Sequence, residues 1–142
     1  MNEFPEQKII NAVRELLSVR VNEIFKDWEL LVPVIEFGNI GSRFAVAPVV
    51  SLLSCERSEK ERILLIDAYS LSVSFTLQEN EDSELYCYAY ASAFEKALGD
   101  DVTLGEIVDR AVITGKKYMP PKNLLCGEGW GLFFTLRITV EK

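Results

Sequence analysis

The side chains best suited to chemistry are few and scattered in this sequence. The thiols of Cys55, Cys87 and Cys126 lie far apart and form no CxxC pair. An odd number of cysteines at such spacing is unlike a disulfide framework or a zinc knuckle, so we expect buried or half-buried thiols. The absence of histidine removes histidine-dependent triads, HExxH zinc sites and histidine general bases. The sequence therefore predicts no catalytic centre, no cofactor and no metal site.

A glycine-rich segment, CGEGWG at 126–131, resembles a phosphate-binding loop only superficially. It has neither the Lys-Ser/Thr pair of a P-loop nor the GxGxxG spacing, and it precedes an expected strand rather than a helix. We interpret it as a hairpin or bulge turn.

Asp67 is the most unusual carboxylate, because it interrupts an apolar strand, ILLIDAY. A buried carboxylate requires a partner, and Arg43, Arg62 or Arg137 could supply one. A structural or edge-facing aspartate is a better interpretation than a catalytic one.

Composition indicates one domain, residues 1–142, of an ordinary globular protein. Apolar residues make up 49 % and charged residues 26 % of the chain. No apolar run approaches the roughly 20 residues needed to cross a bilayer, and the N-terminus lacks the features of a signal peptide, so we expect a cytoplasmic product.

The net charge of −7 argues against tight binding to nucleic acid, although Lys116, Lys117 and Lys122 form a local basic cluster. The acidic balance suits solubility, or a passage through which DNA must slide.

The longest regular pattern lies at 60–78, where apolar and small polar residues alternate. Leu71, Val73, Phe75 and Leu77 fall on one side and serines and a threonine on the other. This period of two predicts a long strand with one dry face.

Other patterns predict the elements around this strand. Helices are expected at 5–28, at 83–98 with Ser83 as N-cap and Gly99 as terminator, and at 103–110, where TLGE forms a capping box. Strands are expected at 33–37, 44–55, 111–118 and 132–141, with a charged hairpin tip at 56–61. Trp28 is expected in the apolar stripe of the first helix. The fold class is then mixed α/β (α+β): a mostly antiparallel sheet with a long β-hairpin and helices packed on one face.

Three segments together resemble a known family. They are the first helix with LLVPVIEF, the long strand entering an acidic turn and a Tyr/Ala-rich helix, and DDVTLGEIVDRAVITGKKYMP leading to WGLFFTLRITVE. In this order they resemble the tail-terminator (tail-completion, minor tail) proteins of long-tailed bacteriophages and prophages. Cys55, Cys126 and the GEGWG segment match no feature of that family.

The resemblance implies a non-catalytic structural protein that forms a homo-oligomeric ring, commonly a hexamer. It would cap the tail tube and join it to the head connector, with the tail tube protein and the head-completion protein as partners. It would act in the bacterial host cytoplasm during assembly and then in the virion tail. Two alternatives remain: a small intracellular protein-binding module, or an enzyme that uses carboxylates with tyrosine or cysteine.

A ring requires two different contact surfaces on each subunit, and three exposed segments are candidates because glycine and charge let a loop adapt to a neighbour. The first is the loop GNIGSR, with Gly38, Asn39, Gly41, Ser42 and Arg43. The second is the hairpin tip, with Glu56, Arg57, Glu59 and Lys60. The third is the turn that carries Trp130.

Overall fold

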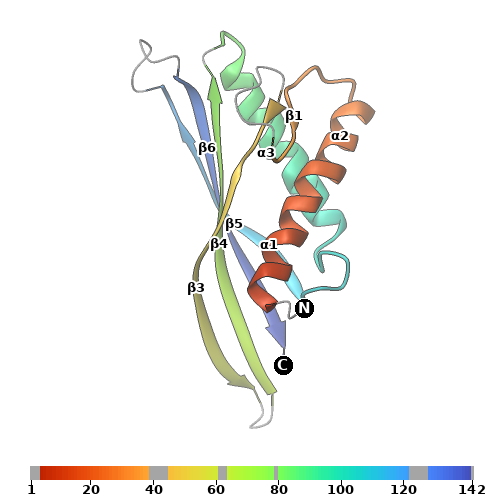
Figure 1. The fold of residues 1–142 in the computed structure, drawn as a ribbon, viewed down its shortest axis with the longest axis vertical. Coiled ribbons are helices and arrows are strands. Elements are labelled where there is room, and N and C mark those ends of the chain that lie inside the picture. Colours follow the sequence, from red (N-terminus) through yellow and green to blue (C-terminus); the bar gives the residue numbers. More distant parts are fainter. Residues whose placement is uncertain (1–3, 39–44, 61–63, 79, 122–127, 142) are drawn as a thin grey trace.

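The computed structural model describes residues 4–38, 45–60, 64–78, 80–121 and 128–141. A helical layer lies on one side of an antiparallel sheet, which confirms the predicted α+β class (Figure 1). The helical elements are α1 (Pro5–Glu15), a π-helical segment (Leu16–Val21), α2 (Asn22–Asp27) and α3 (Ser83–Asp100). The strands are β1 (Val34–Ile35), β2 (Ala45–Val46), β3 (Val49–Lys60), β4 (Leu64–Gln78), β5 (Arg110–Met119) and β6 (Glu128–Glu141).

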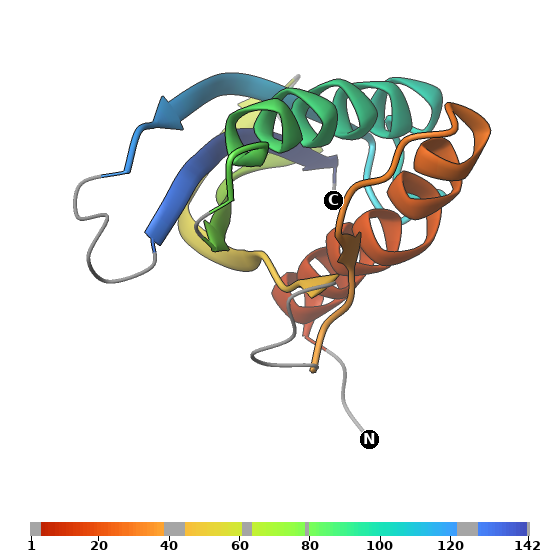
Figure 2. The ribbon, with the colours of Figure 1, turned by 90° about the horizontal axis from the view of Figure 1, so that it is seen from above.

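The main sheet has the strand order β3-β4-β6-β5, and every neighbouring pair is antiparallel. Both β3 and β5 are therefore edge strands. The short strands β1 and β2 form a separate parallel pair. Viewed along its length, the sheet curves around the helices, with α3 over β5 and β6 and with α1 facing the β3 side (Figure 2).

The core lies between the sheet and the helices, as the alternation in β4 predicts. Leu71, Val73, Phe75 and Leu77 are all buried on the helix-covered face. Aromatic rings fill the space above them: Tyr90 of α3 stacks on Phe75 at 4.9 Å between ring centroids and meets Phe25 edge-on at 5.5 Å. Such pairs add about 0.5–1.5 kcal/mol each beyond the area they bury.

The first helix follows the predicted apolar stripe but is interrupted by one wider turn. Leu17 and Val21 are both buried, whereas Arg20 is only half-buried. A regular 3.6-residue period would bring Arg20 to the core side after Leu16 and Leu17. The π-helical segment at Leu16–Val21 absorbs the extra residue and keeps Val21, Ile24 and Phe25 facing inward.

Trp28 corrects one prediction, because it stands 39 % exposed at the end of α2 rather than in the core. The chain leaves the helix axis at this point. Glu29 adopts a left-handed conformation with φ of 55°, and the amide of Leu30 donates to the carbonyl of Phe25. This is the Schellman arrangement that ends a helix, here without the usual glycine.

The helix ends in the second half of the chain also differ from the prediction. Ser83 is the first residue of α3 and is buried, Asp82 is the N-cap, and the helix continues through Gly99 to Asp100. No helix forms at 103–110. The capping-box bond exists, since the amide of Glu106 donates to Oγ1 of Thr103 at 3.2 Å. However, Leu104, Gly105 and Glu106 all have positive φ, which gives tight turns instead.

Two strands extend beyond their predicted bounds, and the strand predicted at 44–55 is divided into β2 and β3. Residues Glu56–Lys60 belong to β3 rather than to the hairpin tip, and they pair with Leu64–Ala68 of β4. At the other end, β6 begins at Glu128, so Gly129, Trp130 and Gly131 lie in a strand and not in a turn. Pro48 immediately precedes β3, which agrees with the predicted strand start on an edge.

Candidate interaction surfaces

The hairpin of β3 and β4 projects past the rest of the sheet at the lower end of the molecule (Figure 1). We call residues 56–60 and 64–68 the arm. The last described pair between β4 and β6 joins Ile66 to Glu141, so among the described residues Leu64 and Leu65 pair only with β3. An isolated two-stranded ribbon is marginally stable in water. Four of the predicted contact residues lie here, namely Glu56, Arg57, Glu59 and Lys60, and all four are exposed.

An ion pair joins the two strands at the base of the arm. Asp67 is 1 % exposed, and its two carboxylate oxygens accept from Nε and Nη2 of Arg57 at 2.6 and 2.9 Å. The hydrogen bond to Asp67, with the attraction of its charge, raises the pKa of the Arg57 guanidinium.

The predicted partners of Asp67 did not include Arg57. Arg43 and Arg62 lie outside the described residues, and Arg137 belongs to the opposite face of the sheet. The missed signal was the hairpin register: the pairing of Lys60 with Leu64 places Arg57 directly across from Asp67.

Two positions along the hairpin from this ion pair, Cys55 pairs with Tyr69. Cys55 is exposed, contrary to the expectation of a buried or half-buried thiol, because it lies on the edge strand. Burial, reinforced by the neighbouring Cys55, raises the pKa of the Tyr69 phenol. Cys126 lies outside the described residues.

The other two predicted surfaces are only partly placed. Gly38 is exposed in a turn with φ of 91°, a conformation that suits glycine. Asn39, Gly41, Ser42 and Arg43 lie outside the described residues. Trp130 is half-buried in β6 and packs against the core, which makes it a less accessible contact than the predicted turn would have been.

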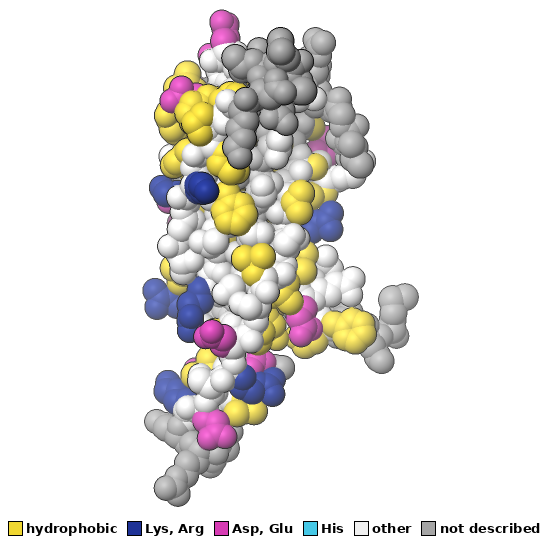
Figure 3. Space-filling view, turned by 90° about the vertical axis from the view of Figure 1, so that its left-hand side faces the viewer, with side chains coloured by type: hydrophobic (Ala, Val, Ile, Leu, Met, Phe, Trp, Pro, Cys, Tyr) yellow, Lys and Arg dark blue, Asp and Glu magenta, His cyan; other side chains and the backbone are white. Residues whose placement is uncertain are grey.

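Figure 3 shows the sheet face opposite the helices, where uncharged polar side chains and backbone lie among hydrophobic patches and scattered charges. One row across it joins Ser51, Ser72 and Thr135, and the next joins Ser54, Ser70 and Arg137. Charged side chains on this face include Glu56, Arg110, Lys117 and Arg137. Charges of both signs are therefore scattered over the face.

Sequence reasoning missed an apolar surface that follows α2. Leu31 is 97 % exposed, and Trp28, Leu30 and Val34 are also exposed. The hydroxyl of Tyr90, which is completely buried, donates to the carbonyl of Pro33 at 2.6 Å and fixes this connection to α3. The side-chain amide of Asn22 bonds both the amide and the carbonyl of Ile35 at 2.9 and 2.8 Å. We call Trp28, Leu30, Leu31 and Val34 the apolar turn.

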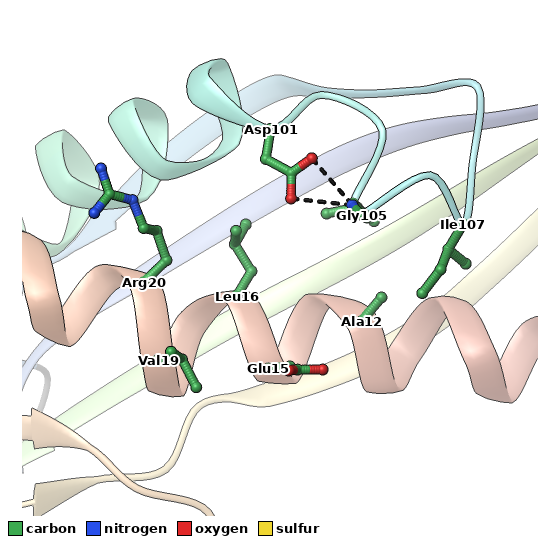
Figure 4. A pocket seen from close by; sticks show the side chains of 9 residues that line it. Ala12, Glu15, Leu16, Val19, Arg20, Asp101, Gly105 and Ile107 are labelled. Carbon is green, nitrogen blue, oxygen red and sulfur yellow. Dashed lines mark hydrogen bonds between the residues drawn. The ribbon is translucent and has the colours of Figure 1, made fainter.

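A pocket of about 320 Å³ lies between the first helix and the turn at 101–107 (Figure 4). Leu16 points into it, and Ala12, Val19, Leu104 and Ile107 complete its apolar lining. Two of its polar groups are engaged: both oxygens of Asp101 accept from the amide of Gly105 at 3.0 Å, and Arg20 pairs with Glu23 and Asp100. The lining therefore offers packing rather than an acid–base pair.

Several titratable groups of the described residues have structural roles. Lys116 pairs with Glu95 at 2.8 Å, and this hydrogen bond raises the pKa of the lysine. Burial raises the pKa of the Cys87 thiol to about 11. Within the described ranges, no group of three metal-ligating side chains comes together, and no helix is long and apolar enough to cross a membrane.

No protein-family model matches this chain, and a search of curated proteins finds no matching relative.

Proposed function

We propose that this protein is a non-catalytic assembly protein of a long-tailed phage or prophage, which caps the tail tube and joins it to the head connector. The order of its elements and the three sequence segments that resemble tail terminators support this proposal. The working unit would be a homo-oligomeric ring, with the tail tube protein and the head-completion protein as partners.

The arm is the observation that carries the proposal. Leu64, Leu65 and Ile66 are only half-buried, and within the described residues Leu64 and Leu65 pair with no strand other than β3. Apolar side chains on such a projection gain stability when a neighbouring subunit covers them. A tube cap must contact identical neighbours and a different protein above or below, and a projecting arm suits that geometry.

A second candidate function, a protein-binding module, is favoured by the apolar turn. Contiguous exposed apolar side chains on a small domain commonly mark a partner surface. This candidate needs no ring and no tail.

The test adds purified protein to phage tails assembled without a terminator. We expect tube elongation to stop at a defined length and head joining to be restored. The variant Leu65→Asp should abolish both effects by placing a charge on the arm, whereas Val102→Asp, an exposed position away from the arm, should leave them intact. Matching circular dichroism spectra would establish that both variants are folded. If the wild-type protein neither stops elongation nor restores head joining, the binding-module function becomes the better account.

A further inference from the structure

The two edge strands of the main sheet, β3 and β5, are complementary in direction and in the positions of their bulges. We propose that the β3 edge of one copy pairs with the β5 edge of a second copy, in a fixed antiparallel register. This inference rests on the ring in the proposed function, and it adds which edges meet and which residues face each other.

Strand direction permits this contact. Each neighbouring pair in the order β3-β4-β6-β5 is antiparallel, so β3 and β5 run in opposite directions. A second copy rotated about an axis along the strands would place its β5 beside β3 as another antiparallel neighbour. The contact uses two different edges, so it repeats from copy to copy and can close into a ring.

The pairing already present in the sheet fixes the register. One row across the sheet runs through Val49, Ser74, Phe133 and Lys117, and another runs through Glu56, Ala68, Thr139 and Arg110. If each row continues into the same row of the next copy, Val49 faces Lys117 and Glu56 faces Arg110.

Bulges in the two edges decide whether the residues between these rows can match. The β3 strand carries one extra residue, Leu53, between Leu52 and Ser54. The β5 strand carries one extra residue, Thr114, between Ile113 and Gly115. Edge bulges ordinarily obstruct further pairing. Here the bulges lie at adjacent levels on opposite edges, so Val49–Glu56 and Arg110–Lys117 contain the same number of residues and pair without a slip.

Exposure and charge agree with this register. Val49 and Leu53 are 62 % and 57 % exposed, and β3 carries no charge from Val49 to Ser54. Opposite-charge neighbours across antiparallel strands are favourable, and the register sets Glu56 against Arg110 on the uncovered face. The amide of Ala111 already donates to the carbonyl of Val102, so the shared backbone ladder ends above Ala111. The contact between Glu56 and Arg110 is then made by side chains.

Disulfide trapping tests the register. The background carries Cys55→Ser and Cys126→Ser and retains Cys87, which is buried. Val49→Cys with Lys117→Cys should give, on mild oxidation of concentrated protein, a ladder of covalent multimers that ends at one largest species. A matched control, Val49→Cys with Arg110→Cys, has the same number of thiols out of register. We expect it to give about tenfold less multimer, because a disulfide forms only between closely placed Cβ atoms.

Charge exchange provides an independent measurement of the same contact. Arg110→Glu should weaken self-association in sedimentation velocity, and adding Glu56→Arg to the same chain should restore it. All of these positions are exposed, and unchanged melting curves would show that the variants fold.

Three other outcomes would refute the proposed register. A covalent dimer from Leu53→Cys alone would indicate that β3 pairs with β3 of a second copy. Equal multimers from the out-of-register control, or no multimer at any concentration, would also refute it. Tail capping by a protein that fails this test would refute the register and leave the proposed function standing, whereas failure of both would remove both.

Discussion

The Tyr90→Phe substitution isolates one hydroxyl group in the centre of the core. The ring contacts with Phe25 and Phe75 remain, and only the 2.6 Å hydrogen bond to the carbonyl of Pro33 is lost. A buried acceptor left without its donor costs about 1–3 kcal/mol. Pro33 is half-buried, so water can partly replace the hydroxyl, and we expect the lower part of that range, about 1–2 kcal/mol.

For a domain of this size, such a loss lowers the melting temperature by roughly 3–6 °C. Chemical denaturation should give the same free-energy difference with an unchanged m-value. The control is Tyr88→Phe, which removes an exposed hydroxyl that donates to Glu84 at 2.7 Å and should change stability little. If Tyr90→Phe and Tyr88→Phe melt at the same temperature, the bond to Pro33 does not hold the apolar turn in place, and the reasoning fails.

Three further predictions concern stability. Asn22→Ala removes the amide that bonds both backbone groups of buried Ile35, and we expect equilibrium unfolding to show a loss of about 2–3 kcal/mol; a loss below that of an exposed Ala substitution would contradict this. Glu29→Gly relieves a left-handed conformation, and a gain of about 0.5–1 kcal/mol should appear in thermal melts, whereas destabilisation would show that the Glu29 side chain has a role of its own. The folded-state pKa of Cys87 is raised from 9.0 to about 11, so its contribution to stability is complete below pH 9 and is lost as pH rises through 11. Cys87→Ala should reduce the slope of stability against pH in that window, and an unchanged slope would assign the alkaline loss to other groups.

The sequence predicts the layers of this fold well because burial imposes a period on it. The alternation in β4 places Leu71 and Phe75 on the helix-covered face, and the stripe of the first helix identifies Val13, Leu17 and Ile24 as core. These patterns indicate which face is buried, and a local irregularity such as the π-helical turn does not change that face.

The glycines at 127–131 caused the error in the predicted start of the last strand, β6. The three glycines at 127–131 predict a turn, yet β6 already includes Gly129. A Cβ on Gly129 would clash with the carbonyl of Gln78, and one on Gly131 would approach Met119. These glycines permit close approach between chain segments rather than a reversal, and only the neighbouring strands reveal the difference.

The turn at 101–107 shows one local hydrogen bond overriding another local signal. Thr103 caps Glu106 as the capping box predicts, but the carboxylate of Asp101 also accepts from the amide of Gly105 and holds a non-helical loop. The candidate contact residues at 56–60 were likewise predicted only in part. The sequence located charge at 56–60, but it did not show that this charge lies along a paired strand or that Arg57 neutralises Asp67.

The π-helical segment makes the first helix unequally tolerant of changes in chain length. Deleting one residue between Leu16 and Val21 would convert the wide turn to a regular α-helical one while leaving both flanking segments in phase. The same deletion between Ile9 and Glu15 would rotate everything before it by about 100° and turn Ile9 towards solvent. Insertions and deletions that accumulate in this helix should therefore concentrate in the single stretch where the backbone already holds one residue more than a regular helix requires.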